Sequence, residues 1–548
     1  MGRIKKNNPR KGTAPEPVPA KPKQRKALRL PIFLLFVLAL WAWTTFYYRS
    51  IFEVSREYSF WSTDSRLLTY FMSQPNAWIR YVGRMLLTAF HYPWLGSTLL
   101  TLLLAGGTYL FDYVLRALSH RDEPQPSSLP LSLLCGVLPY LPALAYLAVL
   151  TELGLDSFYE SETGYIMAVP LLYLVGMLLL ALLVGLSTRH PLPSLWRAAK
   201  ADTTVGNWLQ AIVLLLSFAA IVGYNECQRP YVRTICRMIV CHNHQDWEGV
   251  QRVARANAEQ SNRIMATYYA IALVHTDQIG SRVYDIRLEY DTLRLHGMDG
   301  RVNNGINMYL QEGDYHAGLS QTSYHACMEE MVMTGPSLRL LKLMTKCALM
   351  RSEWELARKY LRILSDVPFE GDFCRYYTSL VGSYDLVSTD PEMKKLRELE
   401  PIEDSFENQH QNPTFMGYNL NLGVARSMAA WNNSVAVCLY TKLLPQFTAR
   451  LQPYVGNSLP DNFADGAILA SRKYPEIMDA FPSLKWRASQ LNDYTSKMQP
   501  YMSDRPKYGP TLFPEQKGYY PHYYFFGNLR ATKAGYTGEE PTRNAGVN

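Results

Sequence analysis

The sequence LPIFLLFVLALWAWTTFYY, which runs from Leu30 to Tyr48, decides how this chain is built. It carries no charged residue, and roughly 20 apolar residues suffice for a helix to cross the hydrocarbon core of a bilayer. Before it, residues 1–30 hold ten Lys or Arg and a single acid, a net charge of +9. A basic segment directly before a long apolar run indicates a membrane anchor with a cytoplasmic N-terminus. The run is too long and too aromatic for a signal peptide, so we predict an uncleaved first span.

The excess basic charge of the chain is confined to that N-terminal tail. The 548 residues carry a formal net charge of +8, but residues 31–224 sum to −1 and residues 225–548 to 0. A nucleic-acid-binding domain would carry its basic charge on a folded surface. We therefore expect the lipid bilayer as a partner and no nucleic acid. With 48% hydrophobic residues and only eight cysteines, the composition also excludes a disordered chain and a small disulfide framework.

Four further apolar runs of similar length follow before residue 225. With the first run they predict a polytopic domain over residues 30–226 whose five spans are 30–48, 94–115, 131–150, 165–186 and 208–224. Lys and Arg gather in the tail and in the second and fourth loops, whereas residues 151–164 carry four acids and no base. Because basic loops stay in the cytoplasm, we expect residues 1–29 inside. An odd number of spans then places the C-terminal half outside the cytoplasmic membrane.

The segment around residues 67–90 could form a sixth, weaker span, which would reverse that orientation. Arg80 and Arg84 would then lie near the middle of the span, where each charge costs roughly 2.5–3.5 kcal/mol. We therefore favour five spans. Within the same segment, Trp78–Phe90 has apolar residues at helical spacing, which predicts an amphipathic helix along the outer membrane surface.

Three acids lie in the first outer loop, close behind the first span: Glu53, Glu57 and Asp64. Acids at this place, followed by a surface helix, resemble the arrangement in polytopic glycosyltransferases that use polyprenyl-phosphate sugars. The resemblance implies that one of these carboxylates is a general base or a metal ligand. The other interpretation is a solvated loop in which the acids pair with its arginines, Arg49, Arg56 and Arg66.

Beyond residue 226 the apolar residues take the period of helices. Three sets share the offsets +3, +7 and +10, which line one helix face, and they begin at Trp247, Trp354 and Asn433. Their small or medium residue at +3 is typical of the second helix of a tetratricopeptide-type repeat, to which we assign all three sets. The middle set belongs to a unit of about 34 residues that resembles a tetratricopeptide repeat, with a turn at Arg351–Ser352. No segment shows the alternation typical of a sheet. We predict an all-α chain in which residues 227–500 form an irregular α-solenoid of stacked helix pairs.

Proline and acidic residues mark two helix starts in this half. Thr389-Asp390-Pro391-Glu392 predicts one start, and Leu459-Pro460-Asp461 predicts another whose helix ends before Pro475. Residues 501–548 are expected to be a separate tail, because aromatic rings surround His522 and a polar end follows. These rings would cap the exposed end of the solenoid. The alternatives are contact with the membrane or stacking on a carbohydrate or peptide.

Taken as a whole, the chain resembles a bacterial family in which a polytopic N-terminal half carries an extracytoplasmic helical-repeat half. The resemblance rests on three segments: Tyr81-Val82-Gly83-Arg84, Tyr92-Pro93-Trp94-Leu95-Gly96 and Leu459-Pro460-Asp461-Asn462-Phe463. It implies architecture and no particular activity.

No P-loop, dinucleotide-binding glycine motif, zinc-protease motif or nucleophile elbow occurs in the sequence, and we expect no cofactor. The one dense group of metal-binding residue types is Cys236, Cys241, His242 and His244, among which Cys241, His242 and His244 are the metal candidates. Their spacing fits no known zinc motif. We favour a turn between two helices, with both histidines exposed and Cys236 packed. Most cysteines are expected to be buried thiols without disulfides.

These observations favour a non-catalytic envelope protein, in which the spans anchor a helical-repeat domain that recruits protein or glycan partners. The alternative is a membrane glycosyltransferase that uses a lipid-linked sugar and one of the acids Glu53, Glu57 or Asp64. A transporter would need a row of ionisable residues across the spans, which the sequence lacks.

Overall fold

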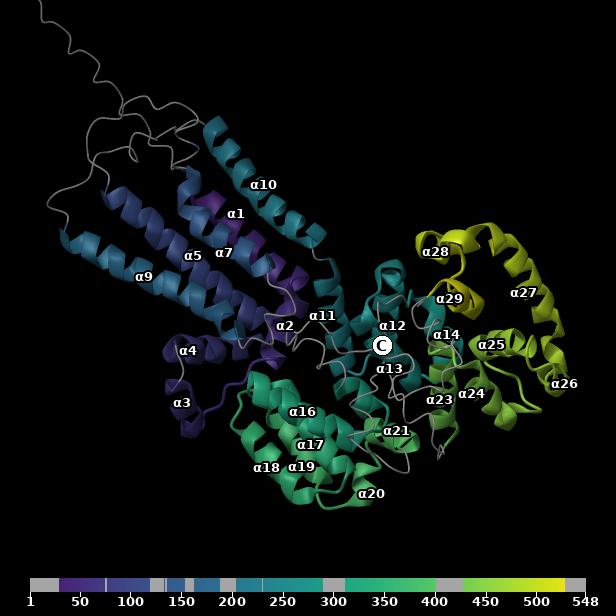
Figure 1. The fold of residues 1–548 in the computed structure, drawn as a ribbon. Coiled ribbons are helices and arrows are strands. Elements are labelled where there is room, and N and C mark those ends of the chain that lie inside the picture. Colours follow the sequence, from purple (N-terminus) through teal and green to yellow (C-terminus); the bar gives the residue numbers. More distant parts are fainter. Residues whose placement is uncertain are drawn as a thin grey trace, which may run out of the picture.

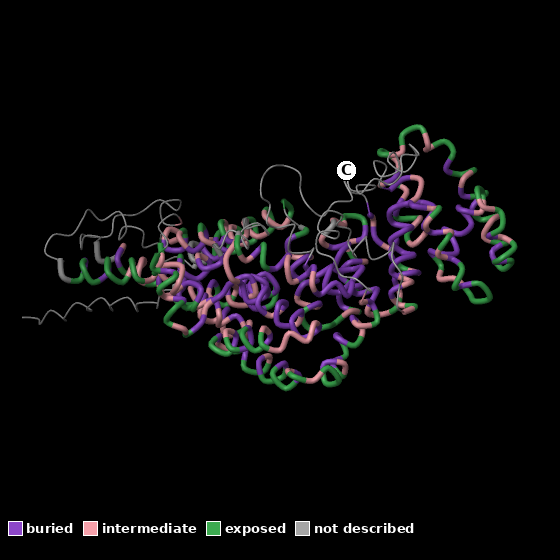
Figure 2. Tube along the Cα trace, turned by 60° about the horizontal axis from the view of Figure 1, so that its bottom comes forward, coloured by how far each residue is buried: buried purple, intermediate pink, exposed green. Residues whose placement is uncertain are grey.

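The computed structural model describes residues 29–73, 76–118, 133, 136–152, 162–187, 204–228, 230–288, 311–400 and 427–527. Within these ranges every regular element is helical and no strand occurs, which confirms the predicted all-α class for the described residues. Figure 1 shows a bundle of long helices at one end, followed by a larger body of shorter helices. Buried residues run without a break from the base of the bundle through the helical body (Figure 2).

Five helices form the bundle: α1 (Arg29–Ala42), α5 (Pro93–Leu118), α7 (Leu141–Glu152), α9 (Tyr165–Ser187) and α10 (Thr204–Gln228). Four apolar segments among the described residues are long enough to cross a membrane: Leu30–Tyr47, Pro93–Leu115, Tyr165–Gly185 and Trp208–Gln228. These match four of the five predicted spans. In the region of the third, 131–150, the described residues form a shorter apolar helix, Leu138–Thr151, which packs on α10 and α5.

Close packing inside the bundle and apolar side chains outside it explain why these helices stay together in lipid. Gly107 of α5 lies so near α9 that a Cβ atom there would come within 2.3 Å of the Tyr173 ring. Small residues at such contacts let helix backbones approach one another. On the outer side of α9, Leu179 and Leu183 are 57% and 62% exposed, as lipid-facing side chains would be.

Three short helices lie in the segment that we predicted to be the first outer loop, a name that we keep for it: α2 (Arg49–Glu57), α3 (Ser65–Met72) and α4 (Ala77–Leu87). The alternative of a sixth span over residues 67–90 is wrong, because α3 and α4 are separate helices and Asn76 before α4 is left-handed with φ 57°. α4 corresponds to the predicted amphipathic helix. It packs against the start of α9, where a Cβ at Gly83 would lie 2.0 Å from the carbonyl oxygen of Gly164.

The helical body follows directly on the last bundle helix. Its helices in chain order are α11 (Pro230–Asn243), α12 (Trp247–Ala256), α13 (Arg263–His275), α14 (Ile279–Arg282), α16 (Ser320–Thr334), α17 (Leu338–Met350), α18 (Trp354–Ser365), α19 (Gly371–Leu380), α20 (Tyr384–Val387), α21 (Pro391–Leu399), α23 (Met428–Tyr440), α24 (Leu444–Ala449), α25 (Asp461–Ser471), α26 (Glu476–Ala480), α27 (Lys485–Met498), α28 (Arg505–Leu512) and α29 (Tyr520–Phe526). Residues 311–316 are also helical. The predicted starts at Pro391 and Asp461 are confirmed, and Asp390 caps α21 by accepting from the backbone N–H of Met393.

One turn geometry joins four of the helix pairs: α11–α12, α13–α14, α17–α18 and α23–α24. One residue in each turn has a left-handed backbone conformation, and the next helix starts two residues after it. These left-handed residues are Gln245, Asp277, Ser352 and Lys442. In each turn the N–H of the left-handed residue donates to the carbonyl three residues before it. The N–H of the next residue donates to the carbonyl five residues before that residue. These are the two hydrogen bonds of the Schellman motif, which satisfies the last carbonyls of a helix.

The helix pairs agree only in part with the predicted sets. Trp247 and Trp354 begin the second helix of their pairs, as expected. Asn433 instead lies in α23, the first helix of its pair, so its assignment to a second helix is wrong. The predicted boundary at residue 500 lies within a short helix, Gln499–Asp504, and of the two helices that follow, α29 packs on α25.

Candidate functional site

The three acids of the first outer loop each contact an arginine of the same loop. Glu53 Oε1 lies 2.5 Å from Arg49 Nε, and Glu57 Oε1 lies 2.9 Å from Arg56 Nη1. Asp64 caps α3 through the backbone N–H of Arg66 and pairs with its guanidinium at 2.7 Å. The expected pairing with arginines is thus observed, but the expectation of a solvated loop is wrong, because most residues of α2 are buried. Hydrogen bonds from Arg66 hold the pKa of Asp64 below its usual value.

Glu57 also belongs to a group of charges, two of them buried and two half-buried, that joins the first outer loop to the helical body. The Lys342 Nζ atom on α17 lies 3.1 Å from Glu57 and 3.0 Å from Glu370, and Arg56 also contacts Glu370. We call Arg56, Glu57, Lys342 and Glu370 the junction cluster. Burial alone would raise the pKa of Glu370, but Lys342 and Arg56 outweigh it and lower that pKa.

Backbone hydrogen bonds support the same junction. The N–H of Leu338 donates to the carbonyl of Ser59, and the N–H of Thr63 donates to the carbonyl of Asp366, both at 3.0 Å. The guanidinium of Arg339 lies over the Tyr58 ring, 5.1 Å from its centroid. The loop behind the first span is thus part of the core that carries α17 and α18, and its acids have a structural role there.

A second group of titratable residues lies inside the helical body, where three histidines form a chain. His316 Nε2 is 2.9 Å from His242 Nε2, and His316 Nδ1 is 2.9 Å from His275 Nε2. Glu312, one helical turn before His316, places Oε2 3.9 Å from Nε2 of both His242 and His316. His242, Glu312 and His316 are buried. We call His242, His275, Glu312 and His316 the histidine cluster.

Helix ends and one helix face bring the histidine cluster together. His242 lies in the last turn of α11, and His275 ends α13. Glu312 and His316 have the i, i+4 spacing that places two side chains on the same helix face. Aromatic rings enclose the cluster: Trp247 stacks on His275 with centroids 4.1 Å apart, and Tyr268 meets His242 edge-on at 5.1 Å.

Burial keeps two of the histidines neutral. Desolvation lowers the pKa of His275 to about 4 and that of His316 well below its usual value. Nearby, burial alone would raise the pKa of Glu392, but Lys346, whose Nζ lies 2.9 Å away, lowers it overall. Gln245 Nε2 also donates to Glu392 at 2.7 Å. Glu392 is thus paired with Lys346 and Gln245, and the neutral imidazoles of His275 and His316 remain within the histidine cluster.

Only one of the three predicted metal candidates belongs to this cluster. His242 is buried, so its predicted exposure is wrong, whereas His244 is exposed and Cys241 half-buried. Cys236 is packed as expected, and burial raises the pKa of its thiol. Sequence reasoning missed His275, Glu312 and His316. The Glu312-x-x-x-His316 spacing was a usable signal, but the partner histidines are 74 and 41 residues away from His316.

Two kinds of chemistry are open to two facing imidazoles and a carboxylate. They can transfer a proton along the row of hydrogen-bonded histidines, or they can bind a divalent cation such as Zn²⁺ through Nε2 and carboxylate oxygen atoms. Neither requires a further cofactor.

A family model matches residues 23–230 and 192–527, and thus spans both the bundle and the helical body. The chain belongs to DUF6057, a family of unknown function. Comparison with curated proteins and with solved structures gives no match. The DUF6057 match thus covers both halves of the chain, and no activity comes with it.

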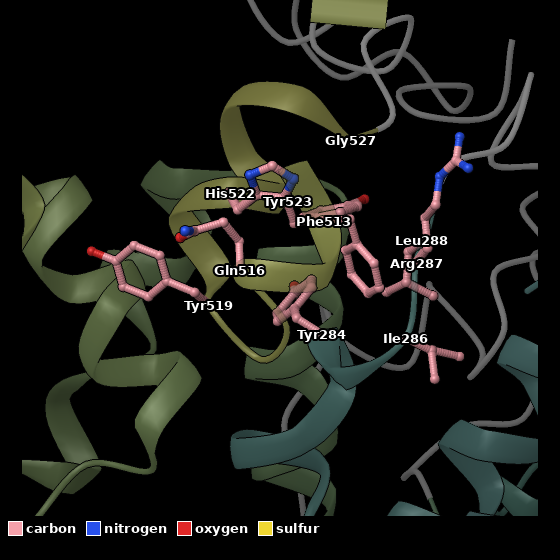
Figure 3. Close-up of a pocket in the computed structure, with 10 residues that line it drawn as sticks. All are labelled: Tyr284, Ile286, Arg287, Leu288, Phe513, Gln516, Tyr519, His522, Tyr523 and Gly527. Carbon is pink, nitrogen blue, oxygen red and sulfur yellow. The ribbon is translucent and has the colours of Figure 1, made fainter. Parts of the chain in front are cut away.

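In this DUF6057 member the aromatic segment near the C-terminus forms core contacts. Tyr520 and Tyr523 of α29 are buried and donate hydrogen bonds to the carbonyls of Leu439 and Tyr440 at the end of α23. A small pocket beside α29 is lined by Tyr284, Ile286, Arg287, Leu288, Phe513, Gln516, Tyr519, His522, Tyr523 and Gly527. Figure 3 shows the Arg287 and Tyr519 side chains pointing away from its centre, on opposite sides. The lining is mainly apolar, so the segment acts as packing.

Seven cysteines lie in the described residues, and all are free thiols. Five of them are buried: Cys236, Cys327, Cys347, Cys374 and Cys438. The expected burial is observed for these five, whereas Cys227 is exposed and Cys241 is half-buried.

Proposed function

We propose that this protein is a non-catalytic adaptor of the cell envelope. Five spans anchor it in the cytoplasmic membrane, and a tetratricopeptide-like solenoid binds protein partners on the extracytoplasmic side. The observation that carries the proposal is the junction cluster, which joins the helical body to α2, directly behind the first span, through the buried pair Arg56–Glu370 and the half-buried Lys342. A body fixed in this way can present a binding surface at a constant distance from the membrane.

Two further observations support this function. Four helix pairs of the body share one turn geometry, which supports a solenoid of helix pairs, and stacked helix pairs are a common architecture for binding extended partners. The charge of the loops supports the orientation, since the basic tail precedes the first span and residues 151–164 are acidic. An extracytoplasmic body requires an odd number of spans, and α7 is the candidate for the fifth.

The glycosyltransferase alternative draws no support from the outer loop. Glu53 and Asp64 each pair with a neighbouring arginine, and Glu57 is part of the junction cluster. A catalytic carboxylate must reach its substrate, whereas these carboxylates are engaged with basic side chains of the protein itself.

Crosslinking in intact cells, followed by purification of the full chain and mass spectrometry, tests the adaptor function. We expect a protein partner in a fixed ratio to the full chain, and its loss from a control chain that ends after residue 228. The adaptor function is wrong if no such partner appears. It is also wrong if Glu53→Gln or Asp64→Asn, present at normal protein level, fails to restore the phenotype of a gene deletion.

A further inference from the structure

We propose that His242, Glu312 and His316 form a binding site for one Zn²⁺ ion inside the helical body. The inference is independent of the adaptor function. It begins with the donor atoms, because two imidazole nitrogens and one carboxylate oxygen are a ligand set that Zn²⁺ accepts with a fourth position for water. Within the described residues the three side chains are buried and their donor atoms all lie within 4.8 Å of one another.

The distances between these donor atoms suit a single ion. The Nε2 atoms of His242 and His316 are 2.9 Å apart, and each is 3.9 Å from Glu312 Oε2. Ligands at about 2.0–2.1 Å from a tetrahedral zinc ion are separated by roughly 3.3–3.4 Å. The observed separations lie on both sides of this value, so side-chain shifts below one ångström would bring all three to one ion.

The opposite ring nitrogens are held in the way that metal-binding histidines require. His242 Nδ1 lies 3.3 Å from Asn243 Oδ1, and His316 Nδ1 lies 2.9 Å from His275 Nε2. If both Nδ1 atoms carry the proton, they donate to these partners and leave both Nε2 lone pairs directed at the centre. Such outer hydrogen bonds fix the tautomer and orientation of a ligating ring. Two lone pairs 2.9 Å apart repel each other unless a cation lies between them.

Glu312 is oriented from its other side. Its second oxygen, Oε1, lies 3.7 Å from Arg339 Nη1, while the Nη2 atom of Arg339 is bonded to Glu330 at 2.7 and 2.9 Å. The carboxylate therefore keeps Oε2 toward the imidazoles. The surrounding Trp247 and Tyr268 rings make the environment of the site less polar, which strengthens a charge interaction at the centre.

A proton could occupy the place of the ion. In that state His275 donates to His316, and His316 donates through Nε2 to His242, so the chain is satisfied without metal. The metal-bound state and this metal-free state differ in a measurable way, because only the metal-bound state holds one zinc ion per chain. A bound ion would tie the end of α11 to the helical residues 311–316, with His275 of α13 in the outer layer.

The test uses the full chain in detergent, purified through a tag without histidine, stripped with a chelator and dialysed against Zn²⁺. We expect one zinc per chain by elemental analysis, and Co²⁺ in its place should give the absorption of a tetrahedral site. Mg²⁺ should not bind, because it prefers an octahedral shell of oxygen ligands. His316→Gln and Glu312→Gln should lose the ion. His275→Gln should weaken binding about 10–100-fold, as outer-layer changes do.

His244→Gln is the matched control, because His244 is an exposed histidine two residues from His242. It should keep one zinc per chain. The site is disproved if the wild-type chain holds well below one zinc, or if a folded His316→Gln chain retains it. It is also disproved if His244→Gln loses as much bound zinc as His316→Gln and Glu312→Gln do. Should the ligand variants fail to fold, the Co²⁺ spectrum of the wild-type chain decides, since an octahedral spectrum would contradict the proposed tetrahedral site.

Discussion

At the scale of single residues, the charges of the junction cluster are each balanced by opposite charges from another part of the chain. Glu370 is 3% exposed and contacts both Arg56 and Lys342. Glu370→Gln would remove a buried negative charge and leave Arg56 and Lys342 to share Glu57. Losing one partner of a buried ion pair costs about 3–5 kcal/mol. We expect the Glu370→Gln chain to unfold at a clearly lower temperature than the wild-type chain when the full chain is heated.

The control for this change is an exposed ion pair of the same domain. The Glu355 and Arg358 side chains are 88% and 49% exposed, and such pairs contribute about 0–1 kcal/mol. Glu355→Gln should therefore leave the melting temperature almost unchanged. Similar losses in the two variants would contradict the role of the junction cluster.

His522 should make the C-terminal helices sensitive to acid. It accepts from the Tyr494 hydroxyl at Nδ1 and donates from Nε2 to the carbonyl of Gly509, so its neutral ring satisfies both partners. Burial lowers its pKa from 6.5 to about 4. Between these values the unfolded chain takes up a proton that the folded chain does not. Stability should therefore fall as pH drops from 6.5 to 4, by up to about 3 kcal/mol.

Hydrogen exchange of α29 at pH 7 and pH 5 measures this effect. His522→Gln should lower protection at pH 7 but reduce the difference between the two pH values, because the titrating group is gone. His244→Gln, at an exposed position, should keep the full difference. An unchanged pH dependence in the His522 variant would show that other groups cause it.

At the scale of elements, the four Schellman turns set the angle between the helices of each pair. All four place a residue other than glycine in the left-handed region, which costs an L-residue roughly 1–2 kcal/mol. At Ser352, with φ 58°, glycine would avoid that cost, whereas a β-branched side chain would increase it.

We therefore expect Ser352→Gly to raise the free energy of unfolding by up to about 1 kcal/mol and Ser352→Val to lower it by about 1 kcal/mol. Chemical denaturation of the two variants beside the wild-type chain gives both numbers. Equal stability of the glycine and valine variants would mean that the turn is not held in this conformation in solution.

At the scale of the whole molecule, the number of spans decides which compartment the helical body faces. Five spans place it opposite the N-terminal tail, and four would place both on the same side. A single cysteine at Lys5 and another at the exposed Glu355 distinguish these arrangements. We expect a membrane-impermeant maleimide to label Glu355→Cys in intact cells and Lys5→Cys only after permeabilisation. Protection of both positions would rule out five spans.

Most of the local structure could be predicted from the sequence. Apolar runs predicted four of the long bundle helices, and the proline and aspartate signals at Pro391 and Asp461 predicted two helix starts. These features depend on neighbours within a few residues, which is why a pattern reveals them. The assignment of Asn433 failed because the same apolar spacing occurs in the first and second helices of a pair. The turn residues would have distinguished them.

The sequence by itself determined the helical class, the membrane anchor and the positions of many helix ends, because these follow from hydrophobicity, charge and capping along the chain. Only the tertiary structure decided what the charged and polar residues do. It brought Glu57 to Lys342 and Glu370, placed His242 beside Glu312 and His316, and buried the aromatic segment of α29. The reason is physical: a carboxylate or imidazole is expensive to bury alone, and its partner comes from wherever the packing of helices brings one close.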